Sequence, residues 1–272
     1  MEMFEVLKTR TDGQVLFAAI DNPPINLLGP ALVRDLVSLI RILDKGDTYK
    51  VVVFSSANPD FFIPHVDITK IAEYREIAAQ LVGEPSLALL FRRLSETKAI
   101  TIAQIAGRVR GAGSEFILAC DMRFASREKA IFGQLEAAFG QVAGGGAVQH
   151  LTRTLGRGRA FEVLTSSNDY DADLAERYGW INRAIPDRDL EDFVDALALR
   201  IAKFPHQGLM DIKERINAIS LASVDDLRKD SELFGRATQF PETKERYKKI
   251  IGLGLQQYGD TELNLGRVLG EF

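Results

Sequence analysis

Short apolar segments recur along this chain with helical patterns between them, and this alternation constrains the fold most strongly. VVVFSS (51–56) reads as a continuous apolar strand, and AITIAQIAG (99–107) as another. Such strands are typical of parallel sheets that are covered on both faces. Two later strands are expected, at DMRFAS (121–126) and WINRAI (180–185). Strands that alternate with helices imply right-handed crossovers, so the predicted fold class is α/β.

The N-terminal region predicts two strands and a helix. The strands are expected at Phe4–Lys8 and Gln14–Ile20, around a Thr-Asp-Gly turn. A pair of prolines at 23–24 then interrupts regular structure. We expect the helix to begin at Pro30, because apolar residues repeat at helical spacing after it, and to end at Lys45-Gly46.

The pattern changes near His206, where strands give way to helices. Residues 206–272 contain several helical patterns with no strand between them, so we expect an α-helical region after a core of residues 1–205. A helical region with apolar stripes either packs on a neighbouring subunit or covers its own core. The sequence leaves both arrangements open.

Composition excludes several classes of protein. The net charge of −4 is spread along the chain, so no nucleic-acid-binding surface is expected. A single cysteine, Cys120, rules out an internal disulfide framework and fits a reducing cytosol. The first residues lack the apolar segment of a secretory signal, and no apolar run is long enough to span a bilayer. The three histidines offer no spacing that would hold a metal ion. We therefore expect a cytoplasmic protein with no membrane partner and no metal site.

The segment RGAGSEFILACD (110–121) places a carboxylate among apolar residues. Small residues precede Glu115, which would lie in the first turn of a short helix, EFILAC. The helix dipole favours the ionised carboxylate, whereas apolar neighbours favour the protonated form. A carboxyl group between these influences can be poised for proton transfer. Alternatively, Glu115 caps its own helix, with Ser114 as another candidate cap.

A second carboxylate lies in similar surroundings. FGQLEAAFG (132–140) sets Glu136 among apolar residues between two glycines. Two such acids would allow one to donate a proton while the other directs water. Alternatively, Glu136 is an ordinary loop acid, and spacing alone does not show that it meets Glu115. The segment FFIPHVDITKI (61–71) is expected to start a helix whose exposed backbone could supply an N–H donor.

These segments together resemble the crotonase, or enoyl-CoA hydratase/isomerase, superfamily. The resemblance runs from about Val15 to Lys249, and its parts occur in the family's order. NPPINL (22–27) is similar to the family's PPxNxL segment, and FIPHVDI (62–68) to its FxAGADI stretch. IAGRVRGAGSEFILACDMRFAS (105–126) and FGQLEAAFGQVAGGGAVQHLTRTLG (132–156) are similar to its two glutamate-bearing segments.

The resemblance implies the ClpP-like crotonase fold, a spiral of ββα units with an α-helical C-terminal trimerisation region. It implies an acyl-CoA thioester as the ligand, with coenzyme A as part of the substrate and no separate cofactor. It also implies a homotrimer or homohexamer. The oxyanion donors carried over are the backbone N–H groups of Val66, placed at a helix start, and Ala112. Donors aimed at developing charge are each worth about 3–4 kcal/mol in comparable sites.

The resemblance assigns catalysis to Glu115 and Glu136. Glu115 would deprotonate water and Glu136 would protonate the α-carbon, which favours hydration of a 2-enoyl-CoA. Isomerisation, C–C cleavage, decarboxylation and dehalogenation are alternatives on the same scaffold, as is a catalytically silent protein that binds CoA thioesters. The residues expected to bind substrate are Asn26, Ile63, Pro64, His65, Asp67, Ile68, Gly111 and Gly113.

Several positions depart from the family pattern. Pro64 and His65 stand where relatives usually have Ala-Gly, Ala112 replaces the middle glycine, and Leu135 replaces the proline before the second glutamate. His65 brings a titratable ring near the thioester, either as a third acid–base group or as a substrate filter. Alternatively, His65 is hydrogen-bonded within its loop or faces solvent. Asp67 is expected to cap the next helix or to shape the acyl pocket. These departures suggest a substrate other than a simple fatty enoyl-CoA.

Overall fold

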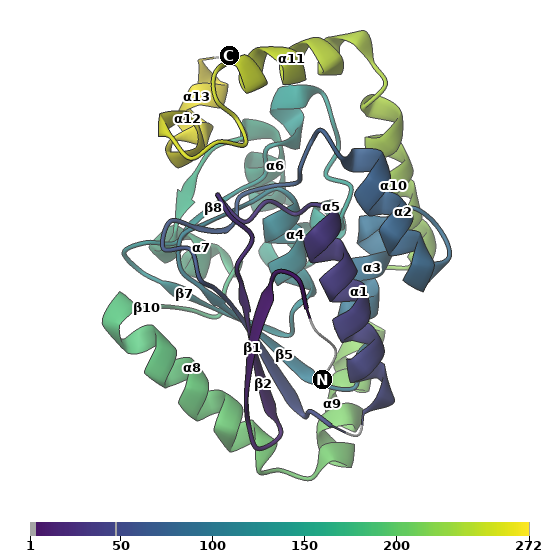
Figure 1. Cartoon of the computed structure of the whole chain (residues 1–272), viewed down its shortest axis with the longest axis vertical. Coiled ribbons are helices and arrows are strands. Elements are labelled where there is room, and N and C mark those ends of the chain that lie inside the picture. Colours follow the sequence, from purple (N-terminus) through teal and green to yellow (C-terminus); the bar gives the residue numbers. More distant parts are fainter. Residues whose placement is uncertain (1–3, 47, 272) are drawn as a thin grey trace.

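The computed structural model describes residues 4–46 and 48–271, and its larger sheet has six strands. The strand order is β1-β2-β3-β5-β7-β10, with β1 and β2 antiparallel and the other neighbours parallel (Figure 1). The strands are β1 (Leu7–Asp12), β2 (Val15–Ile20), β3 (Val51–Ser56), β5 (Ile100–Ile105), β7 (Met122–Ser126) and β10 (Arg183–Ile185).

A smaller sheet has the order β4-β6-β8-β9. Its strands are β4 (Phe61–Ile63), β6 (Arg108–Arg110), β8 (Ile131–Gly133) and β9 (Tyr170–Asp171). Along the chain, β3, β5 and β7 of the larger sheet are each followed by a strand of the smaller one and then by a helix. This is the repeat of two strands and a helix that the resemblance implied.

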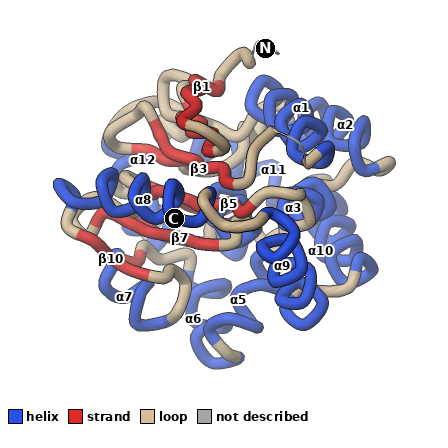
Figure 2. Tube along the Cα trace, turned by 90° about the horizontal axis from the view of Figure 1, so that it is seen from below, coloured by secondary structure: helices blue, strands red, loops and turns tan. Residues whose placement is uncertain are grey.

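Helices cover the larger sheet, as the continuous apolar strands predicted. In β3, Val51 and Val53 pack in a cluster with residues of α8 (Asp187–Ala202), whereas Val52 and Phe54 belong to the main core. The main core also includes α1 (Pro30–Lys45) and α3 (Leu87–Ser95). Figure 2 shows strands of this sheet lying between α8 and those helices. Each valine buried in this way stabilises the fold by about 1.5–3 kcal/mol.

The predicted helix from Pro30 to Lys45 is confirmed, and Gly46 ends it in the left-handed conformation (φ 73°). The first hairpin differs from expectation. Its first strand begins at Leu7 and continues to Asp12, so the turn comprises Gly13 and Gln14. Gly13 adopts φ 54°, which a residue with a side chain rarely tolerates.

The remaining helices of the first 205 residues lie between or after the strands. They are α2 (Ile71–Val82), α4 (Ala112–Ala119), the 3₁₀ helix η1 (Glu136–Phe139), α5 (Ala147–Leu155), α6 (Arg157–Ser166) and α7 (Ala172–Tyr178). Helix α4 begins three residues before the position that the sequence predicted. The Gly-Ala-Gly-Ser segment is therefore the first turn of that helix and not a loop before it.

From residue 206 onward the described chain is helical, as expected. The helices are α9 (His206–Ser220), α10 (Val224–Ala237), α11 (Pro241–Gly252), α12 (Asp260–Leu263) and α13 (Leu265–Gly270). Helix α10 packs on α3 and α5, and α11 packs on η1, so both cover their own chain.

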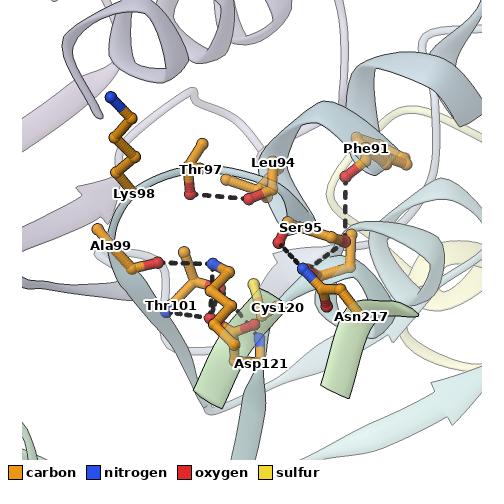
Figure 3. Close-up of polar contacts among 12 residues, drawn as sticks. Phe91, Leu94, Ser95, Thr97, Lys98, Ala99, Thr101, Cys120, Asp121 and Asn217 are labelled. Carbon is orange, nitrogen blue, oxygen red and sulfur yellow. Dashed lines mark hydrogen bonds and ion pairs between the residues drawn. The ribbon is translucent and has the colours of Figure 1, made fainter. Parts of the chain in front are cut away.

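Polar contacts fix α9 to the edge of the core. Asn217 donates to the carbonyl of Ser95 at 2.8 Å, which Figure 3 shows beside the bonds between Thr101 and Asp121. The buried Lys213 ammonium donates to Ala99 O at 2.6 Å and to Asp121 Oδ2 at 2.9 Å. These bonds satisfy a buried charge and orient the opposite face of α9 outward.

No helix in residues 4–46 and 48–271 is both long and apolar enough to cross a membrane. Within the same residues, no three His, Cys, Asp or Glu side chains come together as metal ligands would. Cys120 is buried, and burial raises the pKa of its thiol to about 12, so it stays protonated. The cytoplasmic location remains a prediction.

Candidate active site

One pocket brings together the two glutamates and the two backbone segments that the sequence singled out. It is a cavity of about 50 Å³ that is open to solvent and is lined by residues of α2, α3, α4, η1, α10 and α11 and of the loops between them. The predicted residues that line it are His65, Val66, Ile68, Gly111, Ala112, Glu115 and Glu136. Segments far apart in the sequence therefore converge on one cavity.

Glu115 lies in the first turn of α4, with only 3% of its surface exposed. Its Oε1 accepts hydrogen bonds from the backbone N–H groups of Gly145, at 2.6 Å, and Ala147, at 3.1 Å. These donors belong to the start of α5, whose first N–H groups lack intrahelical partners. Glu115 therefore does not cap its own helix but accepts from the N-terminus of another.

Burial is the main cause that raises the pKa of Glu115, to about 8, and the charge of Glu136 adds to it. The N–H groups of Ala147 and Gly145 act in the opposite direction. The carboxyl group of Glu115 thus takes up a proton at a higher pH than an ordinary glutamate would. Glu136 lines the same pocket, so the ionisation of one carboxyl group disfavours that of the other.

Glu136 begins η1 and is half-buried. Its Oε2 accepts from Gln134 Nε2 at 3.1 Å, and its Oε1 would lie 3.2 Å from a Cβ placed on Gly111. Burial raises the pKa of Glu136 as well. Its carboxyl group thus lies against the backbone that leads into Ala112, so Glu136 is not an ordinary loop acid exposed to solvent.

The backbone at Val66 differs from the prediction. Val66 lies in an isolated bridge with Leu28 and not at a helix start, because α2 begins only at Ile71. Leu28 N donates to His65 O at 2.9 Å, and Asp67 N donates to Leu28 O at 3.0 Å. In this parallel pattern the N–H of Val66 points away from Leu28.

Ala112 is the first residue of α4, so its N–H is among those without an intrahelical partner. The preceding Gly111 adopts φ 49° and donates from its own N–H to Gly133 O at 2.9 Å. This left-handed residue aims the chain into the helix beside Glu136, a geometry that favours glycine.

His65 is buried, and both of its ring nitrogens have partners. Nδ1 lies 2.7 Å from Val66 O, and Nε2 lies 2.8 Å from Oε1 of Glu262 in α12. Burial alone would lower the pKa of His65, but the charge and hydrogen bond of Glu262 raise it above its usual value. His65 is therefore hydrogen-bonded within its loop, as one alternative expected, and also to a residue near the far end of the chain.

The other residues predicted to bind substrate lie outside the lining of this pocket. Asn26 is buried and donates to Ser56 Oγ at 2.9 Å, so it supports the backbone. Gly113 packs against Ile63, whose carbonyl oxygen would lie 2.0 Å from a Cβ on the glycine. Pro64 is buried between Ile63 and His65 and is likewise outside the lining.

Two predicted helix caps are wrong. Asp67 lies outside the pocket lining and accepts from Thr69 N at 2.9 Å and from Gln256 Nε2 at 3.0 Å, whereas Lys70 precedes α2. Ser114 lies inside α4 and accepts from the indole of Trp180 at 3.2 Å. Both side chains join segments that are distant in the sequence.

Sequence reasoning missed the residues that close the pocket. Six come from helices whose apolar pattern gave no sign of function, and the last comes from the turn after α11: Tyr74, Arg75, Leu87, Ser231, Phe234, Tyr247 and Leu255. Gly145 carried a partial signal, because it belongs to a run of three glycines before a helix. A Cβ on Gly145 would lie 2.4 Å from Glu115 Oε2, so the site requires glycine there.

Comparisons with known proteins agree with this geometry. The family model described as "Enoyl-CoA hydratase/isomerase" matches residues 10–259. A "Probable enoyl-CoA hydratase" of Rhizobium meliloti (strain 1021) is 29% identical over 237 residues, covering 85% of this chain and 89% of that protein. A "Short-chain-enoyl-CoA hydratase" of Clostridium acetobutylicum is 27% identical over 253 residues, covering 92% and 96%.

Among solved structures, a crystal structure of a "putative enoyl-CoA hydratase" from Streptomyces avermitilis is 51% identical. It covers 100% of this chain and 99% of its own, with a TM-score of 0.98. The spiral of strand pairs and helices, with its helical C-terminal region, is thus the crotonase fold. The chain belongs to the enoyl-CoA hydratase/isomerase family of the crotonase superfamily.

Proposed function

We propose that this protein adds water across the double bond of a 2-enoyl-CoA thioester. The observation that carries the proposal is the presence of Glu115, Glu136 and the backbone of Val66 and Ala112 around one pocket. Two acids are what the addition of water needs, because one proton must leave the water and another must reach the α-carbon. The names of the relatives support the same reaction.

The two backbone N–H groups would bind the thioester oxygen. When water attacks C3, the C2=C3 electron pair moves toward C2 and the carbonyl, and negative charge develops on that oxygen. The N–H of Ala112 is at the positive end of α4. The N–H of Val66 points away from Leu28, and the bonds that His65 and Asp67 make with Leu28 fix its direction. Donors held in place before the reaction stabilise such charge without rearranging.

The two glutamates would share the proton transfers. Glu115, anchored by Gly145 and Ala147, would take the proton of the attacking water, while Glu136 would give its proton to C2. The water oxygen ends bonded to C3, and the product is a 3-hydroxyacyl-CoA. The pair needs one proton between its two carboxyl groups, and burial raises both pKa values in the direction that keeps one there. No cofactor takes part beyond the coenzyme A of the substrate.

Product analysis in deuterated water tests the reaction. The proposal predicts a 3-hydroxyacyl-CoA with one deuterium at C2, formed from a 2-enoyl-CoA. A product whose double bond has moved, with deuterium at the α-carbon and no added water, would instead identify an isomerase. Binding of the thioester without turnover would identify a silent binding protein.

We also propose that residues 206–272 form an assembly surface, in a trimer or hexamer. Ile212, Ile216 and Ile219 lie on one face of α9 and are 60%, 57% and 82% exposed. Such a row favours contact with another subunit. Light scattering should show an oligomer that Ile216→Glu dissociates, whereas a monomeric wild-type protein would contradict the proposal.

A further inference from the structure

The end of the pocket formed by α2, η1 and α11 carries polar atoms that the proposed chemistry does not use. Tyr74, in α2, is fully buried, and its hydroxyl has no hydrogen-bond partner in the part of the chain that the structure describes. The amide nitrogen of Gln141, just after η1, is also buried and has no hydrogen-bond partner among the described residues. Both residues line the pocket that contains the glutamates. Unsatisfied buried polar groups are costly and rare, so a pair of them requires an explanation.

The Tyr74 hydroxyl lies among other pocket residues. Burial is the main cause that raises its pKa well above the usual value, and the charges of Tyr247 and Glu115 act in the same direction. Tyr247 and Glu115 line the same pocket as Tyr74. Because it stays protonated at neutral pH, the hydroxyl can donate a hydrogen bond.

Gln141 is held by its neighbour in α11. The hydroxyl of Tyr247 donates to Gln141 Oε1 at 2.6 Å, which leaves the amide nitrogen as the group without a partner. A second donor is thus fixed by an existing bond. Tyr247 and Gln141 lie about a hundred residues apart in the chain, so a tertiary contact, and not local structure, orients the Gln141 amide.

Arg75 adds a positive charge to the lining of the same pocket. Its Nη1 donates to the carbonyl oxygen of Ser231 at 3.4 Å, and the charge of Glu76 acts on it as well. Burial lowers its pKa, which shows that the guanidinium is partly removed from water. A partly desolvated guanidinium that donates to a neutral carbonyl favours a ligand that can accept hydrogen bonds or carry negative charge.

We propose that the substrate's acyl group carries a hydrogen-bond-accepting oxygen beyond its reactive double bond, which the Tyr74 hydroxyl and the Gln141 amide nitrogen bind. This inference rests on the proposed function, because it takes the acyl-CoA to occupy this pocket. A plain hydrocarbon chain would leave both donors unsatisfied, and a site built to bind an oxygen discriminates strongly against a chain that lacks it. A ketone and a carboxylate share this chemistry, and Arg75 favours the carboxylate.

Binding of three saturated acyl-CoAs of equal chain length tests the proposal without turnover. The probes are glutaryl-CoA, 4-oxopentanoyl-CoA and pentanoyl-CoA, titrated by calorimetry. We expect at least one oxygenated probe to bind about tenfold or more tightly than pentanoyl-CoA. Preference for glutaryl-CoA would identify a carboxylate, and preference for 4-oxopentanoyl-CoA a ketone. If pentanoyl-CoA binds as tightly as both oxygenated probes while enoyl-CoA is still hydrated, this inference alone is overturned; if none of the three binds, the proposed function fails too.

Tyr74→Phe removes one unpaired hydroxyl, and Tyr170→Phe is the matched control. Tyr170 is also buried, but its hydroxyl lies 3.0 Å from Ser166 Oγ and it lies outside the pocket lining. Tyr74→Phe should abolish most of the preference for an oxygenated chain without lowering Tm. Tyr170→Phe should lower Tm and keep the preference. An equal loss of affinity for all three probes in Tyr74→Phe, or a drop in Tm like that of the control, would overturn the proposal.

Discussion

The Nε2 atom of His65 lies 2.8 Å from Oε1 of Glu262, a residue 197 positions further along the chain. The other ring nitrogen faces the carbonyl of Val66, which can only accept, so Nδ1 carries a proton. Nε2 and Glu262 therefore share the second proton. The pair joins the C-terminal region to the segment that presents the N–H of Val66, so folding of the last helices helps to position the pocket.

Glu262→Gln tests this connection through the pH dependence of stability. The pKa of folded His65 is raised above its usual value of 6.5, so its contribution is complete below that pH and lost as pH rises through the folded pKa. The pKa of Glu262 is lowered from 4.5, so its contribution is lost as pH falls through the folded pKa.

The loss of stability in Glu262→Gln should therefore be largest between pH 4.5 and pH 6.5, the usual pKa values of the two side chains. There it should reach about 3–5 kcal/mol, the cost of leaving one member of a buried pair alone. Urea unfolding of wild type and variant near pH 5.5 and near pH 9 measures the difference. Equal losses at both pH values would show that the pair is not charged.

Gly145→Ala should damage the site directly. The added Cβ would lie 2.4 Å from Glu115 Oε2, so the carboxyl group must move from the N–H groups that hold it. A displacement of this kind costs about a hundredfold in rate. Gly158→Ala is the control, because nothing lies within 4 Å of its Cβ and it sits in helix α6.

The control should gain about 0.5–1 kcal/mol of stability and keep its activity. Steady-state kinetics and thermal unfolding of both variants give the comparison. Full activity in Gly145→Ala would mean that the anchoring of Glu115 does not matter to the reaction.

The rate of hydration should fall as pH rises past about 8, the value to which burial raises the pKa of Glu115. Above that pH the glutamate pair loses its last proton, so no proton remains for the α-carbon. The profile of kcat/KM between about pH 6 and pH 9.5 measures this loss. A rate that keeps rising over this range would place the essential proton elsewhere.

The sheet could be predicted because its strands are locally distinct. VVVFSS opens with four apolar residues and forms β3, in which those four are buried, and the helix after Pro30 ends at Gly46 as expected. Boundaries were less predictable where small residues suit both a loop and a helix. Ala112 and Ser114 were expected in a loop, but the buried packing of Gly113 on Ile63 continues the helix through them.

The site was predictable only in part. Glu115 and Glu136 stood out because charges among apolar residues are rare, and family resemblance paired them. Glu262 gave no such signal, since its partner His65 is remote in sequence and its surroundings are ordinary for a helix end. Tyr74 gave no signal in the sequence, because an unpaired hydroxyl becomes visible only once its neighbours are placed in space.

The measurement that tests the account most directly is the rate of 2-enoyl-CoA hydration by Glu115→Gln, Glu136→Gln and the double variant. Glutamine keeps the shape of each side chain but cannot exchange a proton, so each single variant should lose about a hundredfold to ten-thousandfold in kcat. Because the two acids act in one step, the double variant should lose far less than the product of the single losses. Near-wild-type hydration in either single variant would contradict the claim that both glutamates carry out the reaction.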